Sequence, residues 1–167
     1  MRTLLTTLLL GSLFFSACDI TTGRQWIDLS DAVVDRPVDG VGHYVYALTL
    51  PETVAAGEDL EVQMEWRTVG SVDPNARYTM DIRIDGPAEK TFSLPSGANT
   101  VGELHLANWL NYDFAVPQDF PAGTYELGVR LRDDNRDLVE VPLGYADSLR
   151  LSDGFYRLAR FAVVAAD

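Results

Sequence analysis

The sequence is poor in the side chains on which most enzymatic and metal-binding sites depend. Its 167 residues include one cysteine, Cys18, and two histidines, His43 and His105. One cysteine cannot form a disulfide within the chain, and two distant histidines cannot supply the three or four nitrogen and sulfur ligands of a zinc site. No nucleophile-elbow pattern or triad-like set of serine, histidine and acid stands out. We therefore predict a protein without catalytic residues, without a resident metal and without a cofactor.

Positive charge is scarce as well. Lysine and arginine together number 13, against 25 aspartates and glutamates, and the net charge is −12. Such an excess of acid repels the phosphates of nucleic acids and the head groups of anionic lipids. The composition argues against nucleic acid as a partner. Solubility in a salty or crowded medium is the simplest use of the charge, and calcium or a basic partner is the alternative.

The chain also lacks an apolar run long enough to cross a bilayer as a helix. The run from Leu4 to Phe15 follows a start with one basic side chain and holds about a dozen residues, whereas a span needs roughly 20. A basic start, a short apolar run and small residues before a cleavage site are typical of an export signal. The run ends in Phe15-Ser16-Ala17-Cys18, which resembles the lipobox of bacterial lipoproteins. A plain secretory signal with an incidental cysteine is the alternative.

The lipobox resemblance implies that residues 1–17 are a signal peptide and that Cys18 carries lipid as the first mature residue. A thioether-linked lipid also gives the lone thiol a use in an oxidising compartment. We expect a lipid anchor to the membrane, because several acyl chains bind stably when each buried CH₂ contributes about 0.8 kcal/mol. The expected location is the bacterial cell envelope, facing outside the cytoplasm. Asp19 resembles a retention signal only in enteric bacteria, so the choice between inner and outer membrane stays open.

Cleavage before Cys18 leaves 150 residues, enough for one domain that folds without disulfides or metals. The removed segment contains one arginine and no acid, so the mature net charge is 12 minus 25, or −13. Residues 18–41 contain several aspartates and glycines and few alternating apolar residues. They are predicted to form the lipidated N-terminus and a tether in which Trp26-Ile27 and Val33-Val34 pack locally. Residues 42–167 are predicted to form the folded domain.

In this predicted domain, apolar residues recur at every second position, which is the period of a strand rather than of a helix. Turn residues such as Asp73-Pro74-Asn75 separate the runs. The positions expected to face the core are Tyr44, Tyr46, Leu48 and Leu50; Leu60, Val62, Met64 and Trp66; Tyr78, Met80, Ile82 and Ile84; Phe92 and Leu94; Leu104 and Leu106; Tyr112, Phe114 and Val116; Tyr125, Leu127, Val129 and Leu131; and Leu158, Phe161 and Val163. About seven to nine short strands of this kind predict an all-β fold, an antiparallel immunoglobulin-like β-sandwich. A single sheet closed on itself is the competing fold.

Three segments of the second half occur together in a known pattern: Phe120 to Leu127, Val141-Pro142-Leu143, and Asp153 to Leu158. They resemble the immunoglobulin-like β-sandwich module found at the C-terminus of secreted bacterial glycoside-hydrolase-like proteins of unknown function. The resemblance runs from about Tyr44 to Val164 and implies a sandwich with an accessory, non-catalytic role. Within it, Tyr125 resembles a tyrosine corner, whose hydroxyl bonds to the backbone nearby.

Aromatic residues give the one indication of a ligand. Trp109 and Tyr112 lie beside Asn108, Asn111 and Asp113. Sugar-binding sites combine stacking on aromatic rings with polar neighbours of this kind. The same pattern also suits a strand whose alternate residues enter the core, so core packing and ligand contact both stay open.

The segment Asp133 to Asp137 is the best candidate for a metal. Calcium prefers several oxygen ligands around one loop. The segment lacks the spacing of an EF-hand, and Arg136 places a positive charge inside it. A solvated hairpin tip is the alternative interpretation, and calcium binding stays open.

Two functions of different classes are compatible with these observations. The first is a non-catalytic structural or interaction lipoprotein that docks another envelope protein through a sheet face or an uncovered edge strand. The second is a carbohydrate-binding lipoprotein that uses Trp109 and Tyr112. The exposure of these two side chains separates the hypotheses. No motif specifies the partner, the ligand or the oligomeric state.

Overall fold

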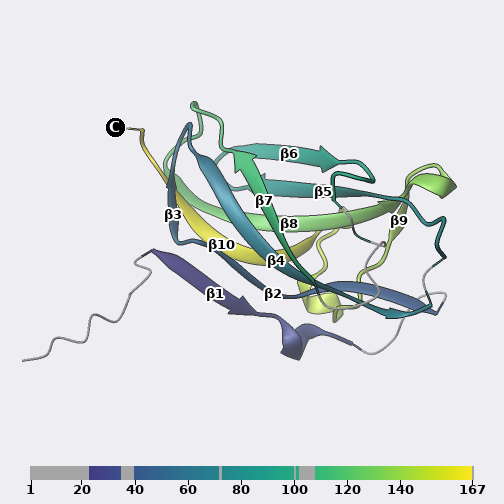
Figure 1. Ribbon diagram of the computed structural model, residues 1–167. Helices are drawn as coiled ribbons and strands as arrows, with labels where there is room; N and C mark the ends of the chain where they lie inside the picture. The colour runs from purple at the N-terminus through teal and green to yellow at the C-terminus, as the bar shows by residue number, and fades with distance from the viewer. Residues whose placement is uncertain (1–22, 35–39, 72, 100, 102–107, 167) are drawn as a thin grey trace, which may run out of the picture.

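Figure 1 shows a computed structural model of the chain, which describes residues 23–34, 40–71, 73–99, 101 and 108–166. The expected signal peptide 1–17 and the lipidation residue Cys18 lie outside these described residues. So do the expected strand positions Leu104 and Leu106, and His105 between them. Within the described part of the chain, no helix has the length and apolar character that crossing a membrane requires.

The described residues form ten strands: β1 Arg24–Asp28, β2 Val41–Pro51, β3 Thr53–Ala55, β4 Asp59–Gly70, β5 Tyr78–Asp85, β6 Glu89–Leu94, β7 Asn108–Ala115, β8 Gly123–Asp133, β9 Val139–Val141 and β10 Tyr156–Val164. One sheet has the order β1-β2-β4-β7. The other has the order β3-β10-β8-β5-β6, with β9 beside β8. Every strand pair is antiparallel except β3 with β10.

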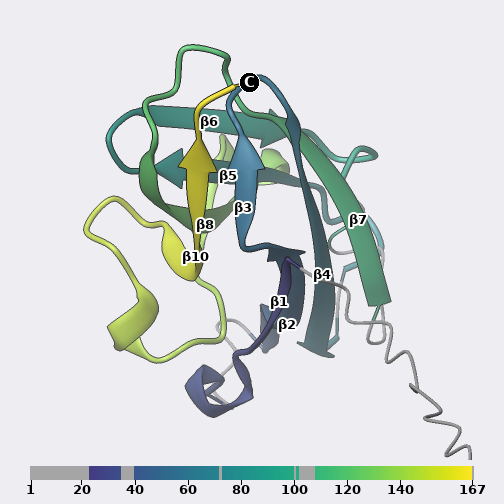
Figure 2. The ribbon, with the colours of Figure 1, turned by 90° about the vertical axis from the view of Figure 1, so that its left-hand side faces the viewer.

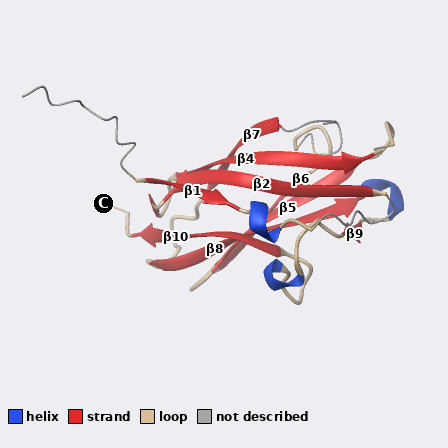
Figure 3. Cartoon of the chain, turned by 90° about the horizontal axis from the view of Figure 1, so that it is seen from below, coloured by secondary structure: helices blue, strands red, loops and turns tan. Residues whose placement is uncertain are grey.

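The two sheets lie face to face, as the end view in Figure 2 shows. This arrangement confirms the predicted all-β immunoglobulin-like sandwich, and it excludes the single closed sheet because each layer keeps its own edge strands. Seen from below in Figure 3, the described parts of the connections between strands are loops and three short 3₁₀ turns, η1 Ser30–Ala32, η2 Asp134–Arg136 and η3 Asp147–Leu149.

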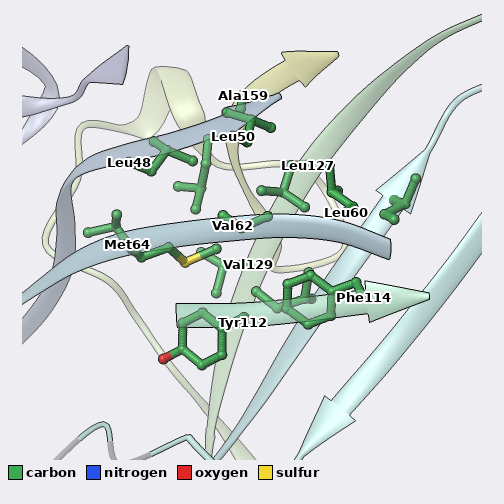
Figure 4. Packing of buried hydrophobic residues seen from close by; sticks show 14 of the residues in the cluster. Leu48, Leu50, Leu60, Val62, Met64, Tyr112, Phe114, Leu127, Val129 and Ala159 are labelled. Atoms are coloured by element: carbon green, nitrogen blue, oxygen red, sulfur yellow. The ribbon is translucent and has the colours of Figure 1, made fainter. Parts of the chain in front are cut away.

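The core lies between the layers and is filled from both of them (Figure 4). The predicted alternation is confirmed most fully in β4, β5 and β8, whose inward positions are buried: Leu60, Val62, Met64 and Trp66; Tyr78, Met80, Ile82 and Ile84; Tyr125, Leu127, Val129 and Leu131. Each fully buried side chain of this size stabilises the fold by about 1.5–3 kcal/mol relative to an exposed one. The burial of both sheets against each other therefore supplies the main driving force for folding.

The predicted tyrosine corner is present. The Tyr125 hydroxyl donates a hydrogen bond of 2.8 Å to the backbone oxygen of Pro121, four residues earlier. The Tyr125 ring stacks against Phe120 at 5.3 Å between centroids. The turn ahead of β8 is thereby fixed to the core that β8 helps to form.

Strand β2 departs from the predicted alternation at Tyr46. The pairing with β4 shifts register between Val45 and Ala47, so one residue of β2 has no partner of its own. Such a β-bulge reverses the faces to which neighbouring side chains point. Val45 is fully buried and Tyr46 is only half-buried, its ring lying 3.3 Å from the guanidinium carbon of Arg67. Tyr46 was predicted to enter the core and instead lies at its margin, as one of the partly buried side chains that pack against it.

The predicted tether is wrong for residues 24–34. Strand β1 pairs in register with β2 from Arg24 opposite Pro51 to Asp28 opposite Ala47. Farther along, the Val34 backbone N–H donates to the Gly144 oxygen at 2.9 Å. The sequence gives little signal for β1, because the two positions that alternate with the exposed Trp26 are Gln25 and Ile27, and only Ile27 is apolar. The sandwich domain therefore begins at about β1 rather than at residue 42.

Candidate ligand-binding face

The outer face of the four-stranded sheet carries a continuous set of polar and aromatic side chains. Alternate residues of a strand point to opposite faces, so one set from each strand meets on this side. We call this surface the tryptophan face. Its residues, from β1, β2, β4 and β7 in turn, are Arg24, Trp26 and Asp28; Ala47 and Thr49; Glu61, Gln63, Glu65 and Arg67; and Trp109, Asn111 and Asp113.

Two exposed tryptophans meet in the middle of this face. Trp26 comes from β1 and Trp109 from β7, which are the two edge strands of the sheet. Their ring centroids lie 5.3 Å apart with the planes at 45°, and the side chains are 60% and 40% exposed. Neighbouring strands are about 4.8 Å apart, so the rings reach toward each other across roughly 14 Å of sheet. They form one aromatic platform rather than two isolated residues.

Ala47 is the smallest side chain on the face. It lies on β2 in the same cross-strand row as Trp109, with Glu65 of β4 between them. Its partner on the other side is Asp28 of β1. Although Ala47 is on the outer face, it is only 1% exposed. A methyl group at this position leaves room above the sheet for larger side chains.

A polar groove of about 240 Å³ lies beside the platform. Its outer walls are the side chains of Arg24, Thr49, Gln63, Asn111 and Asp113, together with Glu61. The Gln63 side-chain amide donates to the Asn111 Oδ1 at 3.0 Å. The groove therefore presents amide, hydroxyl, carboxylate and guanidinium groups within one row of the tryptophans.

Ion pairs neutralise both arginines of the face. Arg24 lies 3.2 Å from a carboxylate oxygen of Glu61, and Arg67 lies 2.6 Å from Glu65. Asp28 accepts a hydrogen bond of 2.8 Å from the backbone N–H of Ser30. Hydrogen bonds from Ser30 lower the pKa of Asp28, so this carboxylate stays charged at neutral pH. The electrostatic character of the face is therefore mildly negative.

The structure separates the four residues predicted to contact a ligand. Trp109 and Asn111 lie on the tryptophan face, as the carbohydrate hypothesis requires. Tyr112 points the other way and is buried, with its hydroxyl 3.3 Å from the backbone oxygen of Asn99, and burial raises its pKa. Asn108, at the start of β7, is half-buried beside Trp66. The carbohydrate hypothesis therefore no longer includes Tyr112 as a ligand contact, whereas Trp109 remains a candidate.

Sequence reasoning missed Trp26 as a functional candidate, because it assigned the residue to a tether. The signal that could have found it is the pentapeptide Arg24 to Asp28, in which Arg24, Trp26 and Asp28 alternate with Gln25 and Ile27. Ile27 packs against the core while Trp26 is exposed. A short edge strand with an exposed aromatic residue fits this pattern.

Two of the three carboxylates of the acidic hairpin tip make contacts within the protein. Asp133 accepts a hydrogen bond from the Asn135 backbone and pairs with Arg136 at 2.7 Å. Asp134 accepts from the Thr79 hydroxyl at 2.7 Å. Within the described part of the chain, no three histidine, cysteine or acidic residues come together in a way that could hold a metal ion. These contacts make the segment a hairpin closure between β8 and β9.

A second cavity, of about 370 Å³, lies at the β8–β9 end of the sandwich beside His43 and Tyr78. His43 of β2 is only 1% exposed, and its Nδ1 lies 2.9 Å from the Thr68 hydroxyl. The Tyr78 ring contacts it edge-on at 4.9 Å. Burial lowers the pKa of His43 to about 4, so the imidazole is neutral at physiological pH.

The fold and this surface define the class of protein: an immunoglobulin-like β-sandwich with an exposed tryptophan pair on its smaller sheet. No protein-family model matches the chain. No curated protein matches it either. Among solved structures it is similar to the CARDB domain of a Pyrococcus furiosus protein, which was solved in complex with di-metal ions. That match has a TM-score of 0.39 and 13% sequence identity, and covers 75% of this chain and 94% of the other.

Proposed function

We propose that this protein is a lipid-anchored, non-catalytic binding module of the bacterial cell envelope that holds its partner on the tryptophan face. The observation that carries the proposal is the exposed Trp26–Trp109 pair. Large exposed aromatic patches on a folded domain mark interaction sites, because exposing them to water is unfavourable without a binding role. The lipobox resemblance at Cys18 supports the location.

The edge strands of the six-stranded sheet are weaker candidates for docking a partner. β3 is three residues long, and β6 begins with the charged residues Glu89 and Lys90. Short and charged edges are devices that discourage pairing with another strand. The tryptophan face is therefore a better docking surface than these two edges.

The non-catalytic part of the proposal is supported by the state of His43. A general base must reach a substrate proton, and a catalytic histidine titrates near the working pH. His43 is buried, and its pKa is lowered to about 4. These properties suit packing rather than proton transfer.

The anchor is tested by feeding cells a radiolabelled fatty acid and recovering the protein. We expect label on the wild-type chain and none on Cys18→Ser, with the wild type in the membrane fraction. Ser16→Thr, a small change ahead of the cysteine, is the matched control and should keep the label. Label that persists on Cys18→Ser would contradict the anchor.

The binding face is tested by photo-crosslinking in intact cells. Benzoylphenylalanine replaces Thr49 beside the tryptophans in one strain and the exposed Val139 of β9 in another. We expect a discrete adduct from position 49 only, and we expect Trp26→Ala to abolish it. An adduct that forms equally well from position 139, or that survives Trp26→Ala, would count against the face.

A further inference from the structure

The aromatic platform has the chemistry of a surface on which a sugar ring stacks. A pyranose with equatorial hydroxyls presents C–H groups on its ring faces, and an indole offers a flat, electron-rich surface to such groups. Trp26 and Trp109 contact each other at 5.3 Å, so their combined surface is larger than one indole. Their mutual contact also reduces the rotamer freedom that binding must remove.

The groove beside the platform has the chemistry that sugar hydroxyls need. A hydroxyl donates one hydrogen bond and accepts others, so its best partners are amides, carboxylates and guanidinium groups. Gln63, Asn111, Asp113, Glu61 and Arg24 supply all three kinds around a volume of about 240 Å³. Adjacent rows on one face of a strand are about 6.8 Å apart. A ring stacked on the tryptophans therefore places the next unit of a chain over the groove.

The charge of the face selects among sugars. Both arginines are paired with glutamates, and Asp28 and Asp113 add negative charge. A uronic acid or a phosphorylated sugar would be repelled, because the described residues of the face offer it no unpaired cation. Neutral sugars and amino sugars meet no such repulsion.

A membrane surface is the competing ligand for exposed tryptophans, which are enriched at bilayer interfaces. The surroundings of this pair disfavour it. Charged side chains, among them Arg24 and Asp113, lie on the same face as the rings. Inserting the rings into a bilayer would desolvate these charged groups as well. Stacking a sugar leaves them in water or hydrogen-bonded to hydroxyls.

We propose that the tryptophan face binds a neutral or aminated polysaccharide chain, with one sugar ring stacked on Trp26 and Trp109 and the next unit hydrogen-bonded in the groove formed by Gln63, Asn111 and their neighbours. The proposal rests on the function proposed above and names the chemical class of its ligand.

The test titrates the full-length protein in detergent with three soluble polysaccharides: the neutral glucan hydroxyethylcellulose, the aminated polymer chitosan and the anionic polygalacturonate. Tryptophan fluorescence reports binding, because Trp66 is 1% exposed and contributes a nearly constant background. Affinity electrophoresis provides an independent readout. We expect the first or the second polymer to bind, and polygalacturonate not to bind at either low or high salt. Preferred binding of polygalacturonate would overturn the proposal.

The variants test the geometry. We expect Trp26→Ala and Trp109→Ala each to weaken binding about tenfold. Because the rings form one platform, the double variant should be only slightly weaker than either single variant, rather than about a hundredfold weaker. Gln63→Ala should weaken binding about threefold. Val139→Ala, which removes exposed apolar surface from β9, is the control and should leave the affinity unchanged. The near-ultraviolet signal of Trp66 verifies that each variant is folded.

The outcomes separate this inference from the proposed function. If no polysaccharide binds while the position-49 adduct still forms with an envelope protein, the carbohydrate proposal fails and the binding module stands. Vesicles that contain brominated phosphatidylcholine test for contact with a bilayer. If they quench tryptophan fluorescence in the wild type, and this quenching is absent in the Trp26→Ala, Trp109→Ala double variant, the face lies against a bilayer and the carbohydrate proposal fails. If neither ligand nor adduct depends on the tryptophans, both proposals fail.

Discussion

At the scale of single residues, His43 makes the stability of the protein depend on pH. It is buried, with a pKa lowered to about 4, whereas an exposed histidine titrates near 6.5. Below about pH 6.5, His43 therefore binds a proton in the unfolded chain, whereas in the folded chain it stays neutral until about pH 4. Stability is fully present above pH 6.5 and falls through this window, by roughly 3 kcal/mol in all. Urea unfolding at several pH values between 7.5 and 4.5 measures the loss.

The matched variant is His43→Gln. It keeps a polar group near Thr68 but removes the titration, so the loss of stability between pH 6.5 and 4.5 should become much smaller than in the wild type. Asp133 and Arg136 line the same cavity and are present in both proteins, so their contribution cancels in the comparison. An unchanged slope in His43→Gln would show that other groups cause the pH dependence.

Tyr145 stabilises β2 just beyond the residues of β2 that pair with β1. The Val45 N–H donates to the Tyr145 hydroxyl at 2.7 Å, and the hydroxyl donates to the Val45 oxygen at 2.5 Å. Tyr145→Phe leaves both buried backbone groups without this partner, and we expect a loss of about 2–4 kcal/mol in the free energy of unfolding. Urea denaturation measures it. Tyr46→Phe removes a hydroxyl from a half-exposed ring and should change stability by less than about 0.5 kcal/mol. Equal effects in the two variants would contradict the assigned role.

These residues show what a sequence pattern can and cannot specify. The inward positions of β4 and β5, from Leu60 to Ile84, were predicted because one strand face is apolar and the other polar. Tyr46 was expected inside the core and lies at its margin instead. A bulge that only the pairing of β2 with β4 determines interrupts the alternation at this residue. Alternation fixes the faces of a strand only as long as its register is unbroken.

At the scale of elements, a buried carboxylate joins β5, β6 and β8 on the outer face of the six-stranded sheet. Asp81 is fully buried and accepts hydrogen bonds from Ser93 at 2.7 Å and from Arg130 and Arg132, each at 2.8 Å. The Phe155 ring covers Arg130, whose guanidinium carbon lies 4.4 Å from the ring centroid. One acid therefore connects three strands, and the aromatic lid limits the access of water to the ion pair.

Asp81→Asn removes the charge and keeps the shape. We expect it to destabilise the fold by about 2–4 kcal/mol, because two partly buried arginines lose their counter-charge. Burial raises the pKa of Asp81, but the hydrogen bonds from Ser93, Arg132 and Arg130 together lower it below its usual value. The stabilisation is therefore present above about pH 4 and is lost as the pH falls below it. Guanidinium denaturation at pH 7 measures the first effect.

Asp85→Asn is the control in the same strand. Asp85 lies 3.8 Å from Arg83, and its side chain is 45% exposed, so we expect a change of less than about 1 kcal/mol. If the two variants were equally destabilised, the connection of three strands by Asp81 would not be the source of the effect.

At the scale of elements, the sequence predicts one of the two strands that carry the tryptophans of the candidate site. Trp109 and Asn111 belong to a strand that the sequence identified, and they point outward because the alternating positions Tyr112 and Phe114 of the same strand are buried. Trp26 belongs to a strand that is established by pairing with β2, because its five residues contain only one apolar position, Ile27, that packs against the core. The site exists because two edge strands far apart in sequence bring one ring each to the same face.

At the scale of the whole molecule, the proposed anchor limits where the tryptophan face can work. Arg24 is six positions after Cys18, and an extended chain spans at most about 3.5 Å per residue. If Cys18 is acylated, the first residue of β1 lies no more than about 20 Å from the lipid attachment point. The ligand must then be accessible close to the membrane surface, since Trp26 is only two residues farther along.

This arrangement predicts the effect of lengthening the segment before β1. We compare the lipidated wild type, reconstituted in vesicles that contain a dansyl-labelled lipid, with a variant carrying 20 Gly/Ser residues inserted after Asp19. Such a flexible insertion adds a root-mean-square distance of about 25 Å. Energy transfer from Trp26 and Trp109 to the dansyl group should therefore fall clearly in the variant. The double change Trp26→Phe and Trp109→Phe provides the background from Trp66. Unchanged energy transfer after the insertion would mean that the domain contacts the bilayer through its own surface. The tryptophan face would then be the first candidate for that contact.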